Sequence, residues 1–77
     1  MKDFFYHVNG TEFHDTVAFG KAWKEARELA KAEHTFVSRT VVSYNWEGKE
    51  KIRYEVYLKG GCFLPDDMAK KDEYYIF

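Results

Sequence analysis

The chain has one cysteine and no long hydrophobic run, and each shortage excludes a class of protein. The single Cys62 excludes an intrachain disulfide and indicates a reducing compartment. No apolar run approaches the roughly 20 residues that a membrane-spanning helix needs. The first residues contain no apolar stretch ending in small residues, which a signal peptide would have. The sequence therefore predicts a cytoplasmic protein.

Neither sign of charge dominates. Twelve Lys and Arg stand against thirteen Asp and Glu, for a formal net charge of −1. Dedicated nucleic-acid binding relies on a basic excess that neutralises phosphates, and a DNA mimic would need an acidic excess. The balanced charge therefore argues against both of these classes. The chain also has no glycine-rich phosphate loop, nucleophile elbow or Walker-type lysine, so we expect no enzymatic activity.

Aromatic residues are abundant: seven Phe, six Tyr and two Trp make up 19% of the 77 residues. A chain of this length has room for one core, so we predict a single domain over residues 1–77. Each aromatic side chain buries about 150–250 Å², which allows a short chain to form a sufficient core without crosslinks. Cys62, beside Phe63 and Leu64, is expected to be a small buried apolar residue.

Residues 4–8 are strand formers that run directly into Asn9-Gly10. This pair favours a type I′ hairpin turn, because both central residues need a positive φ. The return strand follows at residues 11–14. The predicted core face of this hairpin consists of Phe4, Tyr6, Val8 and Phe13.

A helix is predicted over residues 17–34, with Asp15-Thr16 offering an N-cap. Its apolar stripe has the i, i+3, i+4, i+7 spacing of one helix face. The stripe consists of Phe19, Ala22, Trp23, Ala26, Leu29 and Ala30. Gly20, which disfavours a helix interior, is interpreted as a site of close backbone packing near the first turn.

Two further strands are predicted at residues 35–44 and 50–59, joined by a turn with Gly48 in the left-handed position. In this register Val42 lies opposite Ile52, and Arg39 lies opposite Glu55. We assign Ile52, Tyr54, Val56 and Leu58 to the core face, and the Arg39–Glu55 pair to the outer face. The whole pattern predicts an α+β domain of order ββαββ, an antiparallel sheet with one helix on a face. The aromatic end, residues 74–77, is expected to fold back onto the domain, as a short fifth strand, or to dock on a partner.

A candidate metal site lies on the outer face of the first hairpin. His7 sits opposite Glu12, and His14 follows two residues along the same face, which makes a three-ligand set for Zn²⁺. Asp15 adds a fourth ligand or orients one histidine. The alternative is a polar strand face on which His–Glu pairs are ordinary.

Several aromatic residues remain after the core is assigned, and Trp46, at a predicted hairpin tip, stands out. Trp and Tyr are enriched at interface hot spots because they offer large, stiff contact areas. We therefore expect a protein partner to contact Trp46, Tyr57, Arg39 and Arg53. One alternative is that the C-terminal segment covers most of these aromatics. Another is a nucleic-acid face in which Tyr57 is interleaved with Arg39, Lys51, Arg53 and Lys59.

Three stretches together resemble small uncharacterised phage and prophage proteins of Gram-positive bacteria. They are residues 6–25, which include His7-Val8-Asn9-Gly10 and Phe19-Gly20-Lys21-Ala22-Trp23, then residues 39–42, and then residues 59–65 with Lys59-Gly60-Gly61-Cys62-Phe63-Leu64-Pro65. The resemblance implies an accessory protein that binds and blocks a host defence protein, acting as a monomer or weak dimer in the bacterial cytoplasm. Anti-CRISPR proteins, which bind an RNA-guided nuclease, are one such class. The resemblance supplies no catalytic residues.

Overall fold

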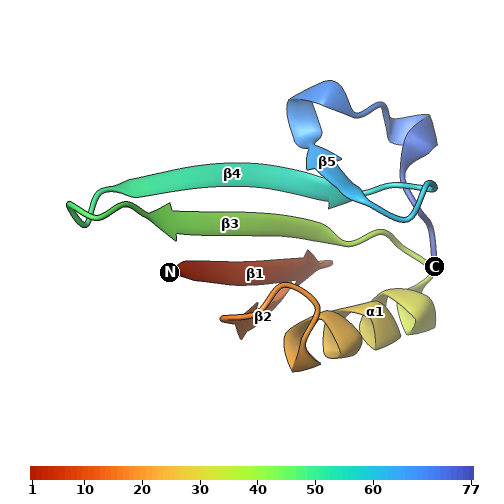
Figure 1. Cartoon of the computed structure of the whole chain (residues 1–77). Helices are drawn as coiled ribbons and strands as arrows, with labels where there is room; N and C mark the ends of the chain where they lie inside the picture. Colours follow the sequence, from red (N-terminus) through yellow and green to blue (C-terminus); the bar gives the residue numbers. More distant parts are fainter.

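The computed structural model describes residues 1–77, and Figure 1 shows one helix against one face of a five-stranded antiparallel sheet. The elements in chain order are strands β1 (Lys2–Val8) and β2 (Thr11–Asp15), helix α1 (Lys21–Glu33), strands β3 (Ser38–Tyr44), β4 (Glu50–Tyr57) and β5 (Phe63–Pro65), and 3₁₀ turns η1 (Asp66–Met68) and η2 (Lys71–Glu73). The strand order is β2-β1-β3-β4-β5. The predicted α+β fold is confirmed, and the fifth strand is Phe63–Pro65, not the C-terminal aromatic segment.

The first hairpin forms as predicted. Asn9 and Gly10 have φ values of 45° and 87°, the left-handed pair that a type I′ turn requires. Tyr6 pairs with Phe13 in the expected register. The side chains of the predicted core face pack together, with Tyr6 and Val8 fully buried.

Helix α1 begins at Lys21, so the prediction of a start at residue 17 is wrong. The cause is Asp15, whose carboxylate accepts the N–H groups of Thr16 at 2.8 Å and Ala22 at 3.1 Å. These bonds fold the connecting residues into a turn before the helix. Gly20 makes this possible, because a Cβ there would lie 2.5 Å from Val17 and 2.7 Å from Asp15. The close packing expected at Gly20 is confirmed.

The register of β3 against β4 is confirmed, but the assignment of their faces is only partly right. Val56 and Leu58 are buried as predicted, whereas Ile52 and Tyr54 are exposed and the Arg39–Glu55 pair is buried. Val42 pairs with Ile52 and Arg39 pairs with Glu55, as predicted. However, β1 pairs with β3 so that Tyr6 lies opposite Arg39, which places Arg39 on the inner, helix-covered face. A hairpin's own pattern fixes its register, whereas its inner face is decided by the strand beside it. Ile52 is consequently 46% exposed.

A buried ion pair occupies the inner face where β3 and β4 meet. The Arg39 side chain donates to Oε1 of Glu55 from Nε at 2.9 Å and from Nη2 at 2.6 Å. Arg53 reaches the other carboxylate oxygen at 3.0 Å. The guanidinium of Arg39 also lies 3.9 Å from the ring centroid of Phe63. Nη1 of Arg39 and the hydroxyl of Tyr6 are buried without hydrogen-bond partners.

Aromatic rings close the rest of the core around Trp23. Its ring centroid lies 4.9 Å from that of Tyr57 and 5.4 Å from that of Phe63. The C-terminal segment folds back onto this cluster, because the N–H of Tyr75 donates to the carbonyl of Tyr57 at 3.0 Å. Cys62 is exposed, so the expectation that it would be buried is wrong. It lies in the turn that connects β4 with β5.

Candidate functional site

The tip of the β3–β4 hairpin extends beyond the rest of the sheet, and we call the tip together with the adjoining strand residues, 42–54, the arm. Figure 1 shows it reaching past the N-terminus of β1, in a molecule 40 Å long and 20 Å across its thinnest axis. Trp46, in the turn at its tip, is 91% exposed. The turn is held in place by Asn45, whose side-chain oxygen accepts the N–H groups of Glu47 and Lys49 at 2.9 Å each. Trp46 is therefore presented on an ordered turn, far from the core.

Further apolar side chains lie along the arm. Ile52 and Tyr54 project from β4 on the outer face of the sheet, which no helix covers, and Tyr54 is 58% exposed. Single apolar residues on a surface are ordinary, but neighbouring ones on one element indicate a contact surface. The arm thus combines an exposed tip tryptophan with an apolar strand face.

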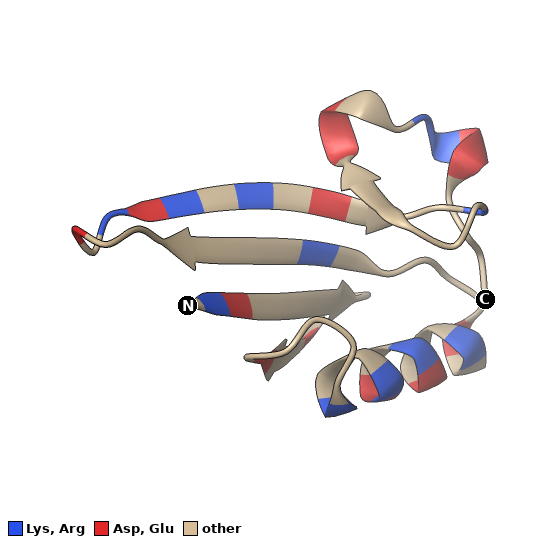
Figure 2. Cartoon of the chain, in the orientation of Figure 1, with Lys and Arg blue, Asp and Glu red and all other residues tan.

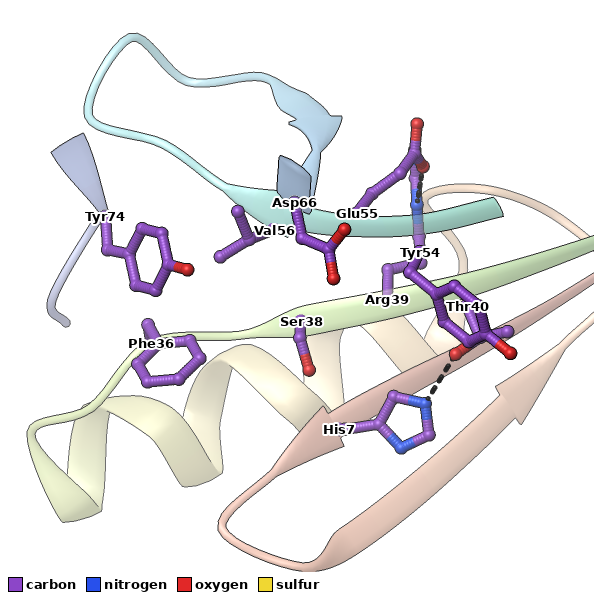
Figure 3. Close-up of a pocket in the computed structure, with 10 residues that line it drawn as sticks. All are labelled: His7, Phe36, Ser38, Arg39, Thr40, Tyr54, Glu55, Val56, Asp66 and Tyr74. Atoms are coloured by element: carbon purple, nitrogen blue, oxygen red, sulfur yellow. Dashed lines mark hydrogen bonds and ion pairs between the residues drawn. The ribbon is translucent and has the colours of Figure 1, made fainter. Parts of the chain in front are cut away.

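A hollow of about 290 Å³ lies on the outer face where the arm joins the body. Figure 3 shows its lining, with aromatic side chains from β4 and from the segments flanking the sheet. The rings of Phe36 and Tyr74 form one wall, with centroids 4.9 Å apart. The carboxylate of Asp66 and the hydroxyl of Tyr74 point into the space. Aromatic faces beside a carboxylate suit a cationic or polar side chain.

On one side of the hollow the hydroxyl of Thr40 lies next to the imidazole of His7, and the carboxylate of Glu12 lies beyond the imidazole, outside the lining. Nε2 of His7 lies 3.0 Å from the hydroxyl of Thr40, and its Nδ1 lies 3.7 Å from Glu12. This order is that of an activated nucleophile. However, the backbone of Thr40 is paired on both sides, with Phe5 of β1 and Tyr54 of β4, which leaves no free N–H beside its hydroxyl for an oxyanion. The set is better suited to hydrogen-bonding a ligand than to acyl transfer.

The predicted zinc ligands are only partly brought together. His7 and Glu12 face each other, but Nε2 of His14 bonds to Asp3 at 2.8 Å. The carboxylate of Asp15 is held by backbone N–H groups, which keep its pKa below the ordinary value, the bond from Ala22 having the largest effect. No group of three His, Cys, Asp or Glu side chains is placed to hold a metal ion. Zinc binding stays a prediction, and it requires His14 and Asp15 to leave their present partners.

The four predicted partner-contacting residues separate into two pairs. Trp46 is exposed, and the side chain of Arg53 is 53% exposed on the arm. In contrast, the Arg39 side chain is only 11% exposed and Tyr57 packs into the aromatic cluster. The placement of Arg39 and Tyr57 on an outer contact face is therefore wrong, because both lie on the inner face. Arg39 and Arg53 are also engaged with Glu55, which weakens the alternative of a nucleic-acid face.

Sequence reasoning missed the hollow and the exposed Ile52 and Tyr54. The lining residues come from β1, β3, β4 and the C-terminal turns, so no local spacing joins them. A signal was nevertheless present in β4, where both alternating sets contain large side chains. Large side chains on both faces of a strand indicate that each face either packs against another element or is exposed as a contact surface.

Comparisons with protein-family models, with curated proteins and with solved structures each found no match to this chain. No helix of the structure is both long and apolar enough to cross a membrane.

Proposed function

We propose that this chain is a small phage-encoded interaction protein that binds and inhibits a host defence protein, such as an RNA-guided CRISPR nuclease, in the bacterial cytoplasm. The proposed role is binding, without catalysis. The observation that carries it is Trp46, 91% exposed on an ordered turn at the tip of the arm. A tryptophan so placed has no part in the core and is the residue type most enriched at interface hot spots.

The rest of the arm supports the same role. Ile52 and Tyr54 extend the apolar surface from the tip toward the hollow. An exposed apolar surface on a small protein is a liability in water and an advantage at an interface. The resemblance to phage accessory proteins supplies the identity of the partner class.

The test is a pull-down of host proteins with the chain as bait from nuclease-treated lysate, followed by cleavage assays with the captured or purified nuclease. One stoichiometric protein partner, with nuclease activity inhibited at about equimolar chain, supports the proposal. Trp46→Ala should lower the affinity by about 30-fold or more, as expected for a hot-spot residue. The unfolding free energy of the Trp46→Ala variant should differ from that of the unmodified chain by less than about 0.5 kcal/mol, as for other exposed positions.

Ile76→Ala is the matched control, since Ile76 is 56% exposed and lies in the C-terminal segment, away from the arm. It should bind like the unmodified chain. Equal binding by Trp46→Ala and the unmodified chain, or capture that disappears with the nuclease treatment, would contradict the proposal. The second result would favour a nucleic-acid-binding role instead.

A further inference from the structure

Strand β4 has an edge that the sheet leaves largely unpaired. On one side β4 pairs with β3 along Glu50–Val56. On the other side β5 covers only Glu55, Val56 and Tyr57. Figure 1 shows this short β5 arrow beside one end of β4, with nothing alongside the rest of β4 on that side. We call the uncovered part, Glu50–Tyr54, the open edge.

The alternation of an antiparallel ladder determines which backbone N–H and C=O groups are unpaired at the open edge. The N–H of Tyr57 donates toward β3, to the carbonyl of Val37 at 3.0 Å, whereas the N–H of Leu58 donates away from β3, to the carbonyl of Cys62 at 2.9 Å. Odd-numbered residues of β4 therefore bond to β3. The even-numbered residues Ile52 and Tyr54 point their N–H and C=O groups outward.

We propose that the open edge accepts an extended segment of a protein partner as an added strand, in which acidic side chains alternate with apolar ones. This proposal rests on the proposed function and specifies how the partner is bound. Main-chain hydrogen bonds would come from Ile52 and Tyr54, as in other cases of strand addition. An exposed strand edge is a ready template for such pairing.

The alternation of side chains at the edge defines the partner segment. Lys51 and Arg53 project on the inner face, and Figure 2 shows them as two basic bands along the edge strand. Lys51 forms no ion pair within the chain. Residues opposite these two cations should be acidic, because opposite charges across a strand pair stabilise it. Residues beside Ile52 and Tyr54 on the outer face should be apolar.

The same cations argue against a second copy of this chain as the occupant. An antiparallel pair of two β4 edges bonded through Ile52 places Lys51 opposite Arg53, twice. Shifting the register by two residues places Lys51 opposite itself, or Arg53 opposite itself. The second of these registers would also bring Lys51 opposite Glu55, but β5 already covers the edge there. Like charges directly opposite destabilise a strand pair. Basic side chains on an edge strand are also a common defence against self-association.

The first experiment uses a capped nine-residue peptide of alternating glutamate and valine, labelled with a fluorophore, and the full chain. We expect saturable binding and slower hydrogen exchange at the amides of Ile52 and Tyr54. A peptide of the same sequence, N-methylated at alternate residues on its bonding side, should bind at least about tenfold more weakly, because each methyl removes a donor. Equal binding of the two peptides, or unchanged exchange at both amides, would overturn the proposal.

Two variants test the edge from the protein side. Ile52→Pro removes an N–H that no strand uses, so the β3 ladder is kept while the added strand is blocked; peptide binding should fall at least about tenfold. Lys51→Glu should lower the affinity for the glutamate–valine peptide about threefold to tenfold and raise the affinity for a lysine–valine peptide. Unchanged binding by Lys51→Glu would refute the charge pattern. If Ile52→Pro does not fold, the N-methylated peptide still decides the question on the unmodified chain.

Failure of this proposal is distinguishable from failure of the proposed function. A host partner that is lost with Trp46→Ala but kept with Ile52→Pro would overturn strand addition alone. Specific peptide binding with no host partner would support the edge and count against inhibition of a defence protein. A concentration-dependent dimer that Ile52→Pro abolishes, seen by sedimentation, would show that a second copy is the occupant and overturn the inference.

Discussion

Arg39→Met should destabilise the fold far more than a change at an ordinary charged residue. Its side chain is 11% exposed and that of Glu55 is 4% exposed, so the substitution leaves a buried carboxylate with one remaining partner, Arg53. Removing one partner of a buried ion pair costs about 3–5 kcal/mol. For a domain of this size, that loss corresponds to a fall of at least about 12 °C in Tm.

The contacts predict a ranking among three single substitutions. Glu55→Gln should cost at least as much as Arg39→Met, because it removes the charge that both arginines share. Arg53→Met should cost only about 0–1 kcal/mol, since the Arg53 side chain is 53% exposed and its ion pair is screened by solvent. Urea unfolding followed by tryptophan fluorescence measures all three, with Tm values as a check.

The double variant Arg39→Met with Glu55→Leu is the control. Replacing a buried pair by apolar side chains is often neutral or stabilising, so the double variant should recover most of the loss. It also keeps the test decisive if Arg39→Met alone does not fold. A loss below about 1 kcal/mol for Arg39→Met would refute the reasoning, because that is the value of an exposed pair.

Three other predictions come from the structure, and a fourth tests the zinc site that the sequence predicts. Tyr57→Ala should cost about 3 kcal/mol in urea unfolding, because Tyr57 packs in the aromatic cluster, and an unchanged stability would place it outside the core. Gly20→Ala should cost about 1–2 kcal/mol in the same assay, because its Cβ would displace the Asp15 carboxylate that caps the helix. Since the folded pKa of Asp15 is lowered, its contribution to stability is present above about pH 4 and is lost as the pH falls through that lowered pKa; Asp15→Asn should remove this part of the acid sensitivity in unfolding curves from pH 6 to 2. Elemental analysis of untagged protein tests the zinc hypothesis, which is contradicted by occupancy below about a tenth of an equivalent, since structural sites are normally filled.

The parts of the fold that local chemistry controls could be predicted from the sequence. The Asn9-Gly10 turn fixes the register of the first hairpin, and the register of β3 against β4 follows from their side-chain pattern. The helix start was missed because Asp15 caps the helix across a turn, from outside the usual N-cap position. Sequence patterns describe neighbours in the chain, and this contact spans seven residues.

The inner face of the second hairpin could not be predicted, because it depends on how β3 pairs with β1. Ile52 and Tyr54 have the composition of core residues, and Arg39 and Glu55 have that of a surface. The structure reverses both, by burying an ion pair whose charges satisfy each other and whose arginine lies against the Phe63 ring. The polar residues were informative, but to interpret them correctly one must know how β1 pairs with β3.

This reversal also explains why the candidate site lies on the arm. With the inner face filled by Arg39 and Glu55, the apolar side of β4 is left facing outward at Ile52 and Tyr54. Each such side chain forgoes part of the about 1.5–3 kcal/mol that full burial provides. A partner strand or surface laid over the arm would recover that free energy on binding. Substitutions on the arm such as Trp46→Ala, which weaken partner binding, should therefore leave the unfolding free energy of the isolated chain almost unchanged. Measuring affinity and stability together thus distinguishes this surface from the core.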